Sequence, residues 1–273
     1  MNFLINFGVL LGTLYAARVK AFQNPIRKPG PDPSVVFAKG FYHLGCNKAT
    51  PFDCTYTHLA DLVPPTGSQG GPKSDFAFSI DGTYLEIPGK GRYHVLSIIN
   101  KDQLQSIAIT KLDTTKWTVD GWHVISVPDQ PWEKNTTNSN PNSITAVNEA
   151  PHPLYHNREI WLSYSASYCG TPNYSLGLLH YNGGDPLPAS SWDKKGPVFS
   201  QANGNYGTGH NCFFTSPDRA ETWNAFHATS NPKGSCGTDR FTLAQKVTFK
   251  PNNSPQFGIP QPLSAALQPP SGE

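Results

Sequence analysis

Charge is scarce in this 273-residue chain: Asp, Glu, Lys and Arg make up 15% of it, and the formal net charge is +2. No run of lysines or arginines occurs, so the electrostatic signature of a nucleic-acid-binding protein is missing. The chain has no C-x-x-C motif, which argues against a structural zinc site. No apolar run beyond residue 21 is long enough to cross a membrane.

Turn-forming and aromatic residues are abundant instead. The chain holds 26 prolines and 24 glycines, and 12% of its residues are aromatic, including six tryptophans. Proline and glycine spread along a chain separate short strands, so the composition favours an all-β protein. Exposed aromatic faces also suit the binding of sugar rings. The length allows one large domain or two small ones.

The N-terminus is expected to be a secretory signal peptide spanning residues 1–21. Residues 3–15 are nearly all apolar but too few to span a bilayer comfortably, and Ala17 and Ala21 both end plausible cleavage sites. The mature chain, 22–273, is then expected to fold as a single extracellular domain. Secretion would make three Asn-X-Ser/Thr sequences candidate glycosylation sites, at Asn135, Asn173 and Asn252.

The five cysteines are odd in number, which leaves at least one outside any intramolecular disulfide. Cys46 and Cys54 could close a small loop, whereas Cys169 and Cys236 would join distant segments. Sequence spacing alone does not choose between these pairings.

A polar side chain recurs where a predicted strand begins. Asp32 stands between two prolines before a predicted hairpin at 35–44, and Asp81 begins a second hairpin. Glu149 is predicted where a loop meets a sheet, with Pro151 at the strand entrance because proline cannot donate to a ladder. Two glycines precede His210 and would let its backbone approach a neighbour. Taken singly, each residue also fits an ordinary turn, surface or core position.

The spacing of these residues suggests a repeat. Asp32 and Asp81 are 49 residues apart, Asp81 and Glu149 are 68 apart, and Glu149 and His210 are 61 apart. A sheet of about four strands repeated at roughly this interval is typical of a β-propeller blade. The first strand of each blade lines the central channel, so the four polar residues are expected to converge on one axial pocket.

Several segments together resemble glycoside hydrolase family 43, the five-bladed β-propeller arabinosidases and xylosidases. The resemblance rests on NPIRKPGPDPS, SIDGTYLE, NEAPHPLY and NGNYGTGHNCFFTSPDRAETWNAFHA. The segments SYCGTPNYSLGLL and GTGHN are most similar to secreted exo-acting α-L-arabinofuranosidases of fungi. The resemblance implies that Asp32 is the general base, that Asp81 tunes and orients the acid, and that Glu149 is the general acid.

The same resemblance implies further site residues. His210 matches a channel histidine that holds a hydrated calcium ion through water, and Arg240 matches an arginine that reaches the sugar. Tyr168, Tyr206 and Phe213, together with Tyr174, are candidate faces for stacking against the furanose ring.

The expected function is release of L-arabinofuranose from plant arabinan or arabinoxylan by a secreted, monomeric inverting hydrolase. A β-xylosidase of the same family is the alternative within enzymes, and an inactive glycan-binding propeller is the alternative outside them. The chain departs from the family at residues 62–73, a linker that stands where roughly 45 residues of a second blade are expected. We therefore expect that the second blade is missing or truncated, leaving a gap in the ring and weakening both stability and activity.

Overall fold

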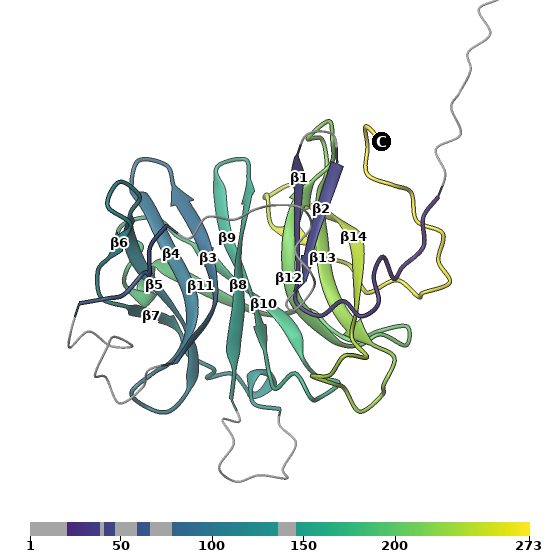
Figure 1. The fold of residues 1–273 in the computed structure, drawn as a ribbon, viewed down its shortest axis with the longest axis horizontal. Helices are drawn as coiled ribbons and strands as arrows, with labels where there is room; N and C mark the ends of the chain where they lie inside the picture. Colours follow the sequence, from purple (N-terminus) through teal and green to yellow (C-terminus); the bar gives the residue numbers. More distant parts are fainter. Residues whose placement is uncertain (1–20, 39–40, 47–58, 66–77, 136–145) are drawn as a thin grey trace, which may run out of the picture.

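The computed structural model describes residues 21–38, 41–46, 59–65, 78–135 and 146–273, and this part of the chain is almost entirely β-structure (Figure 1). Its helices are two single 3-10 turns, η1 (Pro131–Glu133) and η2 (Ala189–Ser191). Among these residues, no helix is long and apolar enough to cross a membrane. The all-β prediction is confirmed.

The described strands form one hairpin and three larger sheets. The hairpin consists of β1 (Pro33–Ala38) and β2 (Phe41–Cys46). The first large sheet holds β3 (Ser79–Ile87), β4 (Gly91–Ile99), β5 (Gln105–Asp113), β6 (Thr118–Val119) and β7 (His123–Ser126). The second holds β8 (Asn148–His156), β9 (Glu159–Ala166), β10 (Ser175–Tyr181) and β11 (Trp192–Phe199). The third holds β12 (Tyr206–Thr215), β13 (Thr222–Thr229), β14 (Phe241–Phe249) and β15 (Pro255–Gln256).

The first strand of each large sheet lies at its edge, next to the first strand of the neighbouring sheet. Within each sheet the strands pair antiparallel, largely in sequence order. Strand β3 packs beside β8, β8 beside β12, and β12 beside β1, and Figure 1 shows the hairpin on the side of β12 and β13. Curled sheets whose first strands lie side by side in this way form a β-propeller, as predicted.

The loss or truncation of the second blade remains a prediction. The described residues 59–65, which lie between the hairpin and β3, contain no strand. The rest of the relevant segment, 47–58 and 66–77, lies outside the described residues. So do residues 1–20 of the predicted signal segment 1–21.

Two apolar clusters hold neighbouring sheets together face to face. The first joins the first and second sheets, and its fully buried members include Leu85, Val95, Ile107, Ile109, Leu162 and Tyr164. The second joins the second and third sheets through Leu176, Leu178, Phe199, Phe226, Leu243 and Phe257. Inner strands such as β9 and β13 are buried along nearly their whole length because both faces of their sheets are covered. The packing fixes the positions of the first strands, which carry the polar residues.

A β-bulge interrupts the first strand of each large sheet, where the pairing register with the second strand shifts. A bulge re-aims side chains and is common beside active sites. At or beside these bulges, non-glycine residues adopt the left-handed backbone conformation, and a further one directly precedes β1. They are Asp32 (φ 51°), Asp81 (φ 57°), Ala150 (φ 52°) and His210 (φ 47°).

The predicted setting of Glu149 was wrong in detail. Glu149 and Pro151 both lie inside β8, not on a loop at a strand entrance. Proline is tolerated there because β8 is an edge strand and its bulge falls between Glu149 and His152.

The N-terminal segment is tied to β14 by the buried side chain of Asn24. Its Nδ2 donates to the carbonyl oxygen of Ala244, and its Oδ1 accepts a hydrogen bond from the Ala244 amide, both at 3.0 Å. We expect Asn24→Ala to lower the free energy of unfolding by about 1–3 kcal/mol, because both backbone groups lose their partner in a buried position. Chemical denaturation measures the effect. The control is Gln23→Ala, at the exposed position next to Asn24. An equal loss of unfolding free energy in this control would contradict the explanation.

Candidate active site

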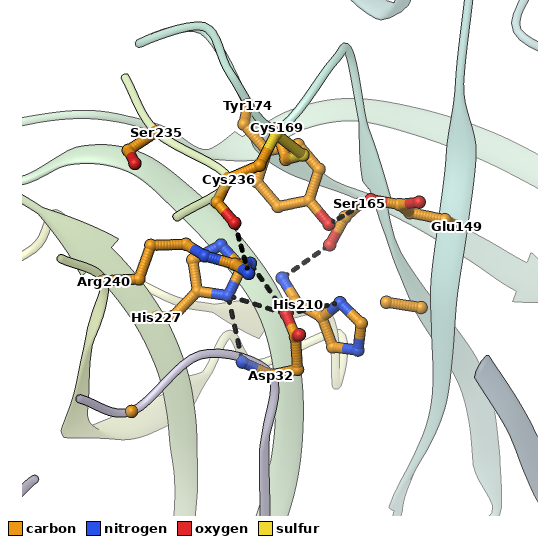
Figure 2. Close-up of polar contacts among 12 residues, drawn as sticks. Asp32, Glu149, Ser165, Cys169, Tyr174, His210, His227, Ser235, Cys236 and Arg240 are labelled. Atoms are coloured by element: carbon orange, nitrogen blue, oxygen red, sulfur yellow. Dashed lines mark hydrogen bonds and ion pairs between the residues drawn. A yellow bond between two sulfur atoms is a disulfide. The ribbon is translucent and has the colours of Figure 1, made fainter. Parts of the chain in front are cut away.

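His210 contacts both of the predicted channel aspartates. Figure 2 shows its ring beside Asp32. The His210 ring lies between two carboxylates: its Nδ1 is 3.1 Å from Asp32 Oδ1, and its Nε2 is 3.8 Å from Asp81 Oδ1. Glu149 joins this group through the next residue, because the Ala150 amide donates to Asp81 Oδ2 at 3.1 Å. The structure therefore brings Asp32, Asp81, Glu149 and His210 together. The Asp32, Asp81 and His210 side chains are 14–20% exposed, so solvent reaches the group.

Asp32 is surrounded by nitrogen atoms. Arg240 Nη1 donates to its Oδ1 at 2.9 Å, and His227 Nδ1 lies 3.3 Å from the same oxygen. Burial alone would raise the pKa of Asp32, but the hydrogen bond with His227 and the positive charges of His210 and Arg240 outweigh it. The net result holds the pKa well below its usual range. Asp32 therefore stays ionised even in acid.

Arg240 is held in place by two backbone carbonyls and a nearby disulfide. It donates to the carbonyl oxygens of Cys236 at 3.0 Å and Gly237 at 3.1 Å. Cys236 is bonded to Cys169, which ties the loop after β13 to the loop after β9 (Figure 2). This confirms one of the two pairings that the sequence left open. The other, Cys46 with Cys54, falls outside the described residues.

Glu149 is held by one donor on each carboxylate oxygen. Gln105 Nε2 donates to Oε2 at 2.8 Å, and the Tyr174 hydroxyl donates to Oε1 at 2.7 Å. Burial raises the pKa of Glu149, and the negative charge of Asp81 adds to the rise. The charge of His210 and the two hydrogen bonds oppose this shift without cancelling it. Glu149 consequently keeps its proton at higher pH than an exposed glutamate does.

Several residues of the site were not predicted from the sequence. Gln105 begins β5, and His227 lies within β13 at 1% exposure. Ser165 Oγ accepts the backbone amide of His210 at 2.7 Å. Tyr174 was predicted as a sugar-stacking face, but it is fully buried and its ring lies parallel to His227 at 5.5 Å. The sequence signal that could have identified them is a polar residue in an otherwise apolar strand. A buried polar residue that is hydrogen-bonded in the core for structural reasons gives the same signal.

The three other aromatic residues predicted to bind sugar are spread out. Tyr168 is 39% exposed beside Cys169, and Tyr206 is half-buried at the start of β12. Phe213 packs against His152 and Phe257, with ring centroids 5.7 and 5.9 Å apart. It lines a hollow of about 700 Å³ formed by the later parts of β3, β8 and β12. Phe213 is thus further along its strand than His210 and does not join the contacts of the carboxylates described above.

The donor set does not fit a directly bound metal ion at His210. Both ring nitrogens of His210 face carboxylates, and the described residues contain no group of three His, Cys, Asp or Glu side chains arranged to hold a metal. A calcium ion bound through its water shell stays a prediction.

The chain has curated relatives with which it shares about a third of its residues. It is 33% identical over 239 residues to an extracellular exo-alpha-(1->5)-L-arabinofuranosidase of Streptomyces avermitilis. It is 30% identical over 252 residues to alpha-L-arabinofuranosidase B of Pyricularia oryzae. These matches cover 83% and 82% of this chain but 45% and 48% of the relatives, so the chain spans about half their length.

Solved structures share the fold. An alpha-L-arabinofuranosidase from Lactobacillus brevis superposes with a TM-score of 0.64 at 24% identity, covering 85% of this chain and 77% of that one. The family model for glycosyl hydrolases family 43 matches residues 55–255. That match covers most of the chain, and with the curated relatives it shows that this chain is a member of glycosyl hydrolases family 43.

Proposed function

We propose that this chain is a secreted inverting glycoside hydrolase that releases L-arabinofuranose from arabinan or from arabinose-substituted plant cell-wall polysaccharide. Inverting hydrolysis needs one carboxylate to activate water and one carboxylic acid to protonate the leaving oxygen. Asp32 takes the first role and Glu149 the second. The arabinofuranosidase names of the two curated relatives support arabinose over xylose, and the word extracellular in one of them supports secretion.

The observation that carries the proposal is the contrast between the surroundings of the two carboxyl groups. Asp32 faces Arg240 and two histidines, whereas the two donors on Glu149 are the uncharged side chains of Gln105 and Tyr174. The nitrogens around Asp32 keep its carboxylate ionised, whereas burial and the Asp81 charge keep Glu149 protonated. Carboxyl groups whose environments push their pKa values apart are the mark of an acid and base pair. Both groups are then in the required form over the same range of pH.

The surrounding residues complete the proposed mechanism. Asp81 accepts the Ala150 amide and so holds the peptide that follows Glu149, while its charge disfavours ionisation of the acid. Arg240 fixes Asp32 and can reach a sugar hydroxyl from the same loop. Tyr168 and Tyr206, both accessible to solvent, are proposed to face the sugar. The enzyme is proposed to work as a monomer.

Time-resolved NMR with an α-L-arabinofuranoside tests the proposal. The first sugar released should be the β-anomer, because water attacks the face opposite the leaving group. A matched β-xyloside should be cleaved much more slowly. Early appearance of the α-anomer would contradict the assignment of Asp32 as general base, and preference for the xyloside would favour the xylosidase. A chain that binds arabinan but cleaves neither substrate would be a glycan-binding propeller.

The Tyr174 hydroxyl is expected to set the upper pH limit of activity. Its hydrogen bond to Glu149 lowers the pKa of that carboxyl, opposing burial. Tyr174→Phe removes this bond, so the pKa of Glu149 rises and the acid stays protonated to higher pH. The alkaline limb of the kcat/KM profile should therefore move to higher pH.

The control is Tyr93→Phe, which also removes the hydroxyl of a buried tyrosine, but one that donates to the Lys90 carbonyl oxygen. Its alkaline limb should match that of the wild type. An unchanged or lowered limb in Tyr174→Phe would show that this hydroxyl does not tune the acid.

A further inference from the structure

The structure contains a completely buried carboxylate that the proposed mechanism does not use. Glu133, in η1, has no exposed surface. Its Oε1 accepts hydrogen bonds from Asn148 Nδ2 at 3.0 Å and from the Tyr164 hydroxyl at 2.8 Å. Its Oε2 accepts the backbone amide of Gln130 at 2.8 Å. A carboxylate with this many donors is fixed in one orientation.

Lys194 supplies the balancing charge. It approaches from β11, and its Nζ lies 3.0 and 3.1 Å from the two oxygens of Glu133. The same ammonium group contacts Asp129 at 2.9 Å and lies over the Tyr164 ring. Removing two charges from water is costly, so a buried ion pair is weak evidence of a contribution to stability.

The pair holds Asn148, the residue directly before Glu149. Every polar side-chain atom of Asn148 is engaged: Nδ2 donates to Glu133, and Oδ1 accepts the Ser126 hydroxyl at 2.7 Å. Its backbone carbonyl oxygen accepts the Ser97 hydroxyl at 2.9 Å. Ser97 Oγ also accepts Gln105 Nε2, which bonds to the Glu149 carboxylate itself. One buried hydrogen-bond network thus holds both the backbone next to Glu149 and the Glu149 side chain.

This support is needed because β8 has its bulge directly after Glu149. The ladder with β9 is regular at Asn148 and Glu149 and shifts register before His152. A bulge leaves backbone groups without their usual partners. Two carboxylates hold the segment on either side of Glu149: Glu133 through the Asn148 side chain, and Asp81 through the Ala150 amide.

We infer that Glu133, paired with Lys194, is a positioning residue for Glu149 and acts through Asn148. The inference rests on the proposed function, in which Glu149 protonates the leaving oxygen. A shift of the acid by a fraction of an ångström weakens proton transfer, and the loss is greatest for substrates whose leaving group needs the proton. A residue that only stabilised the fold would affect all substrates alike.

The test compares an arabino-oligosaccharide with an aryl arabinofuranoside that has a good leaving group. In Glu133→Gln, kcat on the oligosaccharide should fall at least about 10-fold more than kcat on the aryl substrate, within the range that a general acid contributes. KM should change little, because Glu133 has no exposed surface with which to contact a substrate. The control is Glu159→Gln, which removes the negative charge from a 2.6 Å contact with His180 in the sheet that carries Glu149. It should affect both substrates equally.

Ser126→Ala covers the case in which Glu133→Gln does not fold, because it removes only the hydroxyl that orients Asn148. It should show the same selective loss in smaller measure. Equal loss on both substrates in the folded variants, or no loss at all, would overturn the inference while leaving the proposed function intact. A wild-type chain that cleaves neither substrate would overturn the proposed function and the inference with it.

Discussion

Asp32→Asn is expected to reduce kcat by at least about 100-fold on every glycoside, in line with the contribution of a general base. Water must be deprotonated whatever the leaving group, so the loss should be the same on natural arabinan and on an activated aryl substrate. The asparagine keeps the size of the side chain but cannot accept a proton. Steady-state kinetics on both substrates measure the effect.

The control for Asp32→Asn is Asp113→Asn, since Asp113 is an exposed turn carboxylate that accepts the amides of Thr115 and Lys116. It should retain wild-type activity. Selective loss on the natural substrate in Asp32→Asn would indicate that Asp32 assists the leaving group instead, and would reverse the proposed assignment.

Glu149→Gln is expected to show the complementary pattern. Hydrolysis of natural arabinan should fall by about 10²–10⁴-fold, because the departing sugar oxygen needs a proton. An aryl substrate with a good leaving group should lose much less. The variant should also lose the alkaline limb of its pH profile on the aryl substrate, since the group with the raised pKa is no longer present.

Glu86→Gln provides the matched control because Glu86 lies on β3, another first strand, and its carboxylate bonds to Tyr84 away from the site. Its kinetics should match the wild type on both substrates. Equal losses on the two substrates in Glu149→Gln would argue against an acid role.

The sequence was sufficient to predict the all-β architecture. It also predicted that the polar residues at the beginnings of strands lie close together. Short alternating segments between glycines and prolines predict strands at 35–44, 76–87 and 160–165 because each signal is local. The repeat of a polar residue at intervals of about 50–70 residues carries the propeller prediction. These features depend on periodicity, which a single sequence displays directly.

The contacts that set the two pKa values could not be predicted in the same way. Gln105 lies in β5, Tyr174 directly before β10 and His227 in β13, and their partners are 44, 25 and 195 residues away. Such pairs depend on how whole sheets pack, and no local pattern marks them. Pro151 was misplaced for a related reason: only the pairing of β8 with β9 reveals that a bulge accommodates it.

The left-handed conformations of Asp32, Asp81, Ala150 and His210 matter for directed evolution toward heat resistance. Each such non-glycine conformation costs on the order of 1–3 kcal/mol, and four of them gather at one end of the first strands. Random mutagenesis scored by residual folding after heating would therefore find stabilising substitutions there, for example Ala150→Gly. Such substitutions would alter the backbone that orients the carboxylates. A screen of this kind should therefore measure catalytic turnover as well as residual folding, or it will select heat-stable proteins that are inactive.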